Sequence, residues 1–164
     1  MSSDSRVWVY QSSREFTNDE VVEIKEEAEG FIETWAAHGQ SLKASAEIFH
    51  NRFIVIFVDE KQAMASGCSI DDSVDFIKEI ETSFHTSLFD RMIIAYKQEN
   101  IIFTCTLNEF EQFFAEGKIN KNTIVFNNLV STKSEFETNW KVPLKDSWHN
   151  QLVKRENADH HDKY

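Results

Sequence analysis

The chain has 164 residues and a formal charge of −11, from 28 acidic and 17 basic side chains. A charge of this sign and size opposes binding to nucleic acid phosphates and to anionic membrane surfaces, so we expect neither partner class. Hydrophobic residues make up 41% of the chain, which is enough for the core of one domain with a structured extension.

The two cysteines, Cys68 and Cys105, are too few for a disulfide scaffold. The first ten residues lack both the basic and the apolar segment of a signal peptide. No apolar run approaches the ~20 residues of a membrane-spanning helix. We therefore expect a soluble, cytoplasmic protein with reduced thiols.

Hydrophobic periodicity predicts an α+β fold with a ferredoxin-like β-α-β-β-α-β body over residues 1–105. The first helix opens with a capping box, with Thr17 at the N-cap and Glu20 at N3, and should end at His38. A second helix should begin with Ser69 as its N-cap. The predicted strands cover residues 7–10, 42–48, 53–58 and 91–96, and residues 101–105 add a hairpin partner.

The run from Phe53 to Val58 is apolar at every position. A strand with this composition must be covered on both faces, so it should lie in the middle of its sheet. His50 and Asn51 just before it predict a tight reversal from the preceding strand.

Residues 106–153 are predicted to form a C-terminal α/β extension packed on this body. Capping boxes that begin at Thr106 and Thr132 open two short helices, and Gly117 ends the first of them. A short strand over Ile124–Phe126 lies between the two helices. From residue 154 the sequence is polar and predicts a disordered tail.

Several segments resemble one family of small bacterial proteins, mainly from Bacteroidetes, whose members are often named ABC transporter ATPases. The segments are VWVYQSSREFT, AHGQSLKAS, NRFIVIFVDE with ASGCSIDDSV, LFDRM, TIVFNNLV and KVPLKDSWH, and together they extend from about Val7 to His149. The resemblance implies no established activity.

The motifs of the chain do not support the ATPase name. A phosphate-binding loop needs the pattern G-x-x-x-x-G-K-[ST], whose backbone N–H groups and lysine surround the phosphates. The pair Gly117–Lys118 is followed by Ile119, and Gln112 stands where the first glycine belongs. An ABC signature motif needs two glycines where this chain has Gly67 alone. We therefore predict that the protein is not a P-loop ATPase.

Cys68 is the candidate reactive group, because it lies where the buried strand passes into the second helix. The positive end of a helix dipole stabilises a thiolate, and Gly67 permits close approach to the backbone. Acidic residues at 71, 72 and 75 oppose both a thiolate and an anionic ligand, so the alternative is a small buried thiol that packs the loop.

If a pocket exists, we expect it where the loop from Asp59 to Cys68 meets the start of this helix, where free N–H groups need a partner. The surrounding acids favour a ligand that is neutral or cationic or that carries its own metal ion, and they oppose a bare phosphate. The candidate ligand-binding residues are Asp59, Ser66, Gly67, Cys68 and Ser69.

Other candidate groups have structural alternatives. Five aromatic residues could form a ligand platform, but aromatic side chains at helical spacing are usually core and docking contacts. They are Trp8, Tyr10, Trp35, Trp140 and Trp148. His38 and His50 fit structural roles near a helix end and a turn. No C-x-x-C or H-x-x-x-H spacing predicts a metal site, and we expect no cofactor.

These observations favour a non-catalytic, cytoplasmic binding or regulatory module for an unknown small molecule or protein. The alternative is a small thiol-dependent enzyme with Cys68 as its nucleophile. An exposed edge strand in the predicted sheet would also favour a homodimer.

Overall fold

The computed structural model describes residues 1–37, 39–61 and 63–153. It is mixed α and β, as predicted, and its strands form several antiparallel sheets. The chain divides into two compact units. Unit 1 comprises Met1–Asp90 and Asn128–Phe136, and unit 2 comprises Arg91–Asn127 and Glu137–Tyr164.

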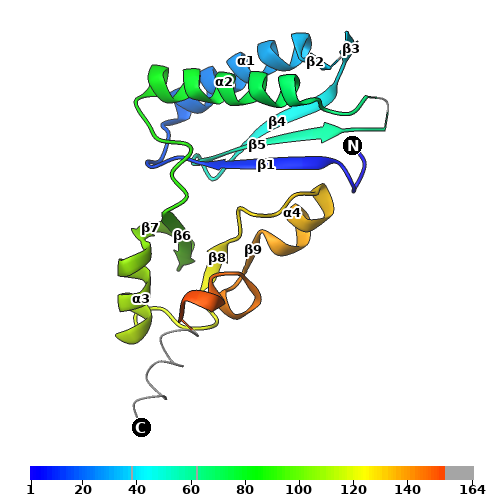
Figure 1. The fold of residues 1–164 in the computed structure, drawn as a ribbon. Helices are drawn as coiled ribbons and strands as arrows, with labels where there is room; N and C mark the ends of the chain where they lie inside the picture. The colour runs from blue at the N-terminus through cyan, green and yellow to red at the C-terminus, as the bar shows by residue number, and fades with distance from the viewer. Residues whose placement is uncertain (38, 62, 154–164) are drawn as a thin grey trace. The chain divides into compact units, whose positions relative to one another are not determined.

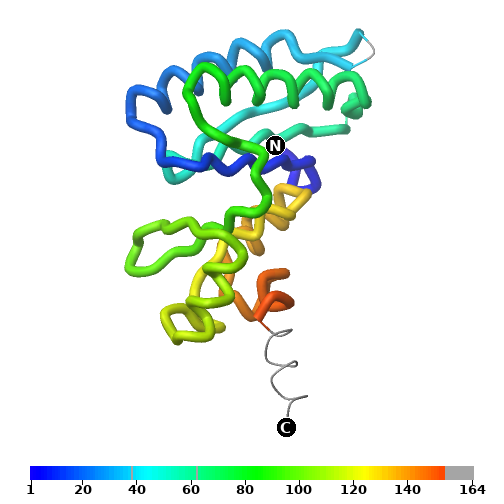
Figure 2. Tube along the Cα trace, turned by 60° about the vertical axis from the view of Figure 1, so that its left-hand side comes forward, coloured from blue at the N-terminus to red at the C-terminus, as the bar shows by residue number. Residues whose placement is uncertain are grey.

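Unit 1 is a three-stranded antiparallel sheet with two helices on one face. Its strand order is β1-β5-β4, and α1 and α2 lie side by side over the sheet (Figures 1 and 2). Thr17 and Glu20 cap α1 as predicted. The elements are β1 (Arg6–Gln11), α1 (Asn18–Thr34), β4 (Lys43–Phe49), β5 (Phe53–Asp59) and α2 (Gly67–Phe84).

The predicted central position of the apolar strand is confirmed. Every residue of β5 is buried, and the strand pairs with β1 on one side and with β4 on the other. Ile54 and Ile56 belong to the core beneath α1 and α2. On the opposite face, the ring of Phe57 lies 5.5 Å from that of Phe136 in α4 (Lys133–Asn139).

The first helix ends at Thr34, so the prediction that it runs to His38 is wrong. Trp35 adopts an extended backbone, and its indole N–H donates a 2.8 Å hydrogen bond to the carbonyl of Ser69 in α2. Anchoring this side chain on the neighbouring helix directs the chain away from α1. A small hairpin of β2 (Ala36–Ala37) and β3 (Gln40–Ser41) follows.

The ferredoxin-like topology is not confirmed. The strand predicted as fourth in the body, β6 (Ile93–Gln98), pairs in a different sheet. The segment that follows Leu129 lies along β1 instead. The N–H of Val7 donates to the carbonyl of Ser131 (3.0 Å), and the N–H of Lys133 donates to the carbonyl of Ser5 (2.8 Å). This segment therefore covers the outer edge of β1.

Unit 2 is built on a four-stranded antiparallel sheet with the order β7-β6-β8-β9. Phe110 of α3 is fully buried in a core with Ile94 and Val125 of the sheet. The elements of this unit are β6, β7 (Ile101–Thr106), α3 (Leu107–Ala115), β8 (Ile124–Phe126), β9 (Lys141–Pro143) and a 3-10 helix (Leu144–Asp146).

The structure divides the chain at different points from the predicted boundary after residue 105. The β6–β7 hairpin belongs to unit 2 because β6 pairs with β8, a strand of the predicted extension. In return, residues 128–136 belong to unit 1. The predicted tail, 154–164, lies outside the described residues.

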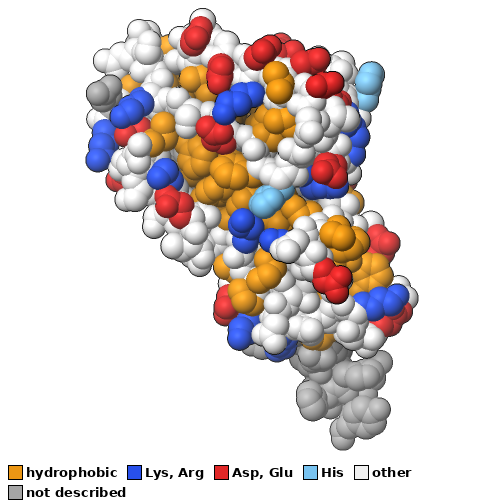
Figure 3. All heavy atoms as spheres, turned by 180° about the vertical axis from the view of Figure 1, so that it is seen from behind, with side chains coloured by type: hydrophobic (Ala, Val, Ile, Leu, Met, Phe, Trp, Pro, Cys, Tyr) orange, Lys and Arg blue, Asp and Glu red, His pale blue; other side chains and the backbone are white. Residues whose placement is uncertain are grey.

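Acidic side chains gather on the outer side of the helices of unit 1, shown in red in Figure 3. They follow the solvent side of α1, whose residues facing the sheet are Ile24 and Ala28. Among the helices that the structure describes, none has the length and apolar character that crossing a membrane requires.

Candidate functional site

The start of α2, where the sequence places a pocket, is capped by its own side chains. The cap is Ser66, not Ser69 as predicted: the N–H of Ser69 donates to Ser66 Oγ (3.1 Å), and the N–H of Ser66 donates to Ser69 Oγ (2.6 Å). These two bonds form a capping box in which serine takes the N3 position that glutamate usually occupies. Ser66, Gly67, Cys68 and Ser69 are thus together in the first turn, with the N–H of Ser69 already bonded.

Asp59 ends β5 and is held by its own loop. Its carboxylate accepts the N–H of Lys61 (3.1 Å) and lies 3.8 Å from the ammonium of Lys43. The neighbouring Glu60 accepts the N–H of Ala65 (2.8 Å) and pairs with Arg6 (3.5 Å). These bonds order the loop around its two carboxylates, and none of them joins Asp59 to the Ser66–Ser69 turn.

The two cysteines lie in opposite environments. Cys68 is exposed, so the alternative that it is a buried packing thiol is wrong. It sits in the first turn of α2 without a side-chain hydrogen bond to any described residue. Cys105 is buried in β7, and burial raises its pKa to about 11.

The other candidates take structural positions. Trp35 and Trp140 are buried, and Trp8 and Tyr10 pack on the core of unit 1. His50 has a left-handed backbone (φ 55°) in the turn that leads into β5. His38 lies outside the described residues. In the described ranges, no group of three or more His, Cys, Asp or Glu could hold a metal ion.

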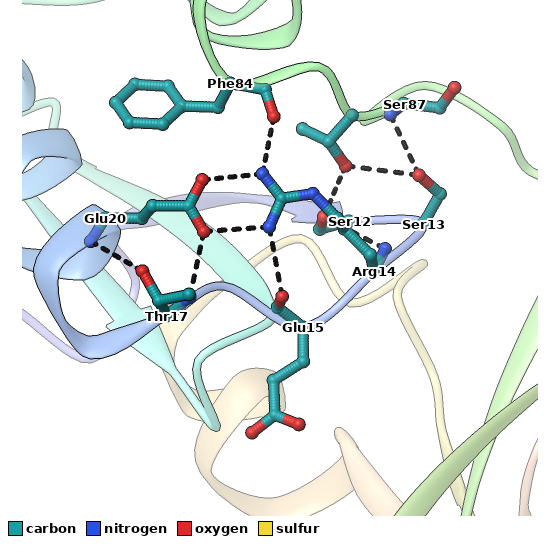
Figure 4. Close-up of polar contacts among 9 residues, drawn as sticks. Ser12, Ser13, Arg14, Glu15, Thr17, Glu20, Phe84 and Ser87 are labelled. Atoms are coloured by element: carbon teal, nitrogen blue, oxygen red, sulfur yellow. Dashed lines mark hydrogen bonds and ion pairs between the residues drawn. The ribbon is translucent and has the colours of Figure 1, made fainter.

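A polar cluster at the end of β1, which the sequence did not reveal, surrounds Arg14 (Figure 4). The Arg14 guanidinium donates two bonds to Glu20 (2.8 and 2.6 Å) and one to the carbonyl of Phe84. Ser12 Oγ lies 2.5 Å from the hydroxyl of Thr86. The pair with Arg14 lowers the pKa of Glu20 to about 2. Because Arg14 bonds the loop before α1 to the last turn of α2, we interpret the cluster as a structural clamp.

His149 is a second feature that the sequence did not reveal. It is almost fully buried, lies against the ring of Trp148 (3.9 Å between centroids), and its Nδ1 is 2.6 Å from Ser147 Oγ. Burial lowers the pKa of His149 to about 4, so the imidazole is neutral at pH 7. Its ring also lies 5.8 Å from that of Phe110, and the side chain is 1% exposed, so we interpret it as a core histidine.

The outer edge of β7 is an exposed surface of unit 2. β7 has the sequence IIFTCT, and among the strands that the structure describes it pairs with β6 alone. Ile101 and Phe103 are 56% and 41% exposed, and with Gln98 and Glu99 they line a shallow, open depression. In Figure 2 the β6–β7 hairpin, in light green, stands out from its unit with the turn outermost.

The other outer strands of the two main sheets carry protection that β7 lacks. β4 carries Lys43 and Glu47, each in an ion pair. β1 is covered by the segment around Ser131, and β9 contains Pro143. Charges, coverage and proline are the devices by which proteins prevent unwanted pairing at sheet edges. By this test, β7 is an edge open to another strand.

A comparison with the profiles of known protein families, with curated proteins and with solved structures finds no match. The resemblance to the bacterial family therefore stays a prediction.

Proposed function

We propose that the protein is a non-catalytic binding module whose binding surface is the outer edge of β7. The observation that supports this most is the strand itself. β7 is uncharged and free of proline, it has no partner on its outer side within residues 1–37, 39–61 and 63–153, and it carries two exposed apolar side chains, Ile101 and Phe103. An extended segment added to such an edge gains backbone hydrogen bonds, and side-chain contacts supply its specificity. A cytoplasmic location is part of the same proposal.

The register of the hairpin identifies the backbone groups that face outward. A two-residue turn at Glu99–Asn100, with both residues left-handed, joins β6 to β7. Such a turn is closed by a hydrogen-bonded pair, here Gln98 and Ile101, and these pairs alternate along an antiparallel ladder. The N–H and C=O groups of Ile102 and Thr104 therefore point away from β6.

Hydrogen-exchange mass spectrometry on dilute protein tests this proposal. Adding an uncharged seven-residue peptide of alternating threonine and isoleucine should slow amide exchange in the segment that contains β7. The matched control lies in the same chain, because exchange in the charged edge strand β4 should not change. Protection of β4, or of neither strand, would contradict the proposal.

A second candidate function follows from the exposure of Cys68. A cysteine in the first turn of a helix can act as a nucleophile if its thiolate is stabilised there. No histidine or lysine in the described part of the chain is bonded to it, so we place this function below the first.

The rate of alkylation at Cys68 separates the two functions. In a binding module, Cys68 should react no faster than a small free thiol under the same conditions. In an enzyme with an activated nucleophile, Cys68 should react much faster than that thiol. Cys68→Ser supplies the background rate.

A further inference from the structure

We propose that the β7 edge binds β7 of a second copy of this chain, so that the two strands pair antiparallel with Phe103 opposite Phe103. This inference rests on the proposed function, because it names the occupant of the same surface. It joins the two four-stranded sheets into one continuous sheet across a two-fold axis.

The backbone of β7 is self-complementary in this register. With Phe103 at the centre, Ile102 of one copy lies opposite Thr104 of the other. These are the residues whose N–H and C=O groups point away from β6, so each of the two symmetric Ile102–Thr104 pairs exchanges two hydrogen bonds. The central Phe103 pair is then a non-hydrogen-bonded pair, the type in which opposing side chains lie closest.

The side chains match as well as the backbone. Phe103 stacks on Tyr96 of β6, with ring centroids 5.6 Å apart and ring planes at 22°. Two-fold pairing extends this stack into a row of four aromatic rings and places the exposed Ile101 opposite Cys105. Orange side chains reach the surface of unit 2 on the side that carries β7 and α3 (Figure 3).

The lack of charge on β7 makes this strand the place where a second copy meets the least repulsion. A chain with a net charge of −11 repels its own copies at most surfaces, but β7 has no ionisable side chain other than the buried Cys105. The contact therefore places no like charges opposite each other on the strand. The long-range repulsion that remains is screened by salt, so the dimer should tighten several-fold as ionic strength rises from low to physiological.

A charge exchange at Phe103 tests the inference and its register together. In analytical ultracentrifugation of the full chain, the wild type should show a concentration-dependent dimer. Phe103→Glu and Phe103→Lys should each weaken the dimer by at least about tenfold, because a charge at this position faces itself. An equimolar mixture of the two variants should dimerise again, which happens only if position 103 faces position 103.

Two further variants distinguish pairing at the β7 edge from a general effect of surface charge or of misfolding. Val22→Glu changes another exposed apolar side chain, on α1, and should leave the dimer intact. Thr104→Pro removes an outward N–H without removing a bond to β6, so it should abolish the dimer while circular dichroism shows that the fold is kept. A dimer that survives Phe103→Glu and Thr104→Pro would overturn the inference.

The inference and the proposed function fail in different experiments. A wild type that stays monomeric at all concentrations overturns the second copy as the occupant. The proposed function survives that result if the threonine–isoleucine peptide still protects β7, and it fails if the peptide does not.

Discussion

The outer strands β4 and β7 lie in hairpins of similar construction, but they differ in the charge of their side chains. Both belong to an antiparallel hairpin whose turn contains two left-handed residues, His50–Asn51 in one and Glu99–Asn100 in the other. β4 carries Lys43 and Glu47 along its exposed edge, whereas β7 carries no charge. Hairpin geometry sets the register of both strands, and composition decides which of them is open to a partner.

The same contrast separates the roles of the two units. Unit 1 has a fully buried central strand and a covered β1 edge, which are features of stability. Unit 2 leaves Ile101 and Phe103 exposed beside its core. Substitutions in β5 should therefore affect folding, and substitutions at the β7 edge should affect association.

Val55→Asp should give the largest effect of any single change. Val55 is fully buried in β5, and an unpaired carboxylate there costs about 3–5 kcal/mol or forces the strand out of the sheet. We expect loss of the cooperative thermal transition, measured by circular dichroism.

Thr104→Asp is the matched change at the β7 edge. Its side chain is only half-buried, so the free energy of unfolding should fall by about 1 kcal/mol, the size of the strand preference of threonine over aspartate. If Val55→Asp melts at the same temperature as Thr104→Asp, the buried central position of β5 does not determine stability, and our inference is wrong.

His149 should make the stability of unit 2 depend on pH. Its pKa is about 4 in the folded protein against an ordinary value of 6.5, so the unfolded chain binds more protons between these values. The stabilisation is complete above pH 6.5 and is lost as pH falls towards 4. This difference in pKa lowers the free energy of unfolding by about 3 kcal/mol between pH 7 and pH 4. Urea unfolding at the two pH values measures it.

His149→Gln should remove this part of the pH dependence, because glutamine does not titrate. The control is His85→Asn, which changes an exposed histidine and keeps a residue type that tolerates the left-handed backbone found there (φ 52°). Equal pH dependence in the wild type and in His149→Gln would show that another group is responsible.

The Arg14 clamp should show a smaller, local effect. Glu20 has a pKa of about 2, first because Arg14 bonds to its carboxylate and second because the N–H of Thr17 does. Its contribution to stability is present above pH 4.5 and is lost as pH falls through 2. Arg14→Lys replaces a two-pronged donor by a single ammonium, so the pKa of Glu20 should rise towards 4.5.

Carbon-detected NMR titration of the Glu20 carboxylate measures that shift. Arg91→Lys, at an exposed arginine, is the control and should leave the Glu20 titration unchanged. A Glu20 midpoint near 4.5 in the wild type would mean that the pair with Arg14 does not form in solution.

The features that could be predicted from the sequence are those that depend on residues close together in the chain. The capping boxes at Thr17 and Thr106 depend on positions three residues apart, and β5 is marked by a continuous apolar run. The start of α2 was misplaced by three residues because both Ser66 and Ser69 can cap a helix.

The features it missed depend on residues far apart in the chain. Arg14 bonds the carbonyl of Phe84, 70 residues away, and nothing local marks that contact. The prediction that β6 belongs to the sheet of the body was wrong, because neither β6 nor β8 carries a sequence signal for their pairing. The β7 edge had a usable signal, the uncharged run IIFTCT after a tight turn, but its exposure follows only from knowing that one side stays unpaired.

Cys68→Ser should have the smallest effect on stability. Cys68 is exposed in the first turn of α2 and does not contribute to the capping box formed by Ser66 and Ser69, so the melting temperature should stay within about 1 °C. The same change should remove nearly all alkylation of the folded protein, measured by intact-mass spectrometry. Cys105, buried and with a pKa of about 11, should react only after denaturation. If Cys105 reacts as fast as Cys68 in the folded wild type, then β7 detaches from its sheet in solution. The β7 edge would then be a mobile strand, and the contrast with β4 would no longer hold.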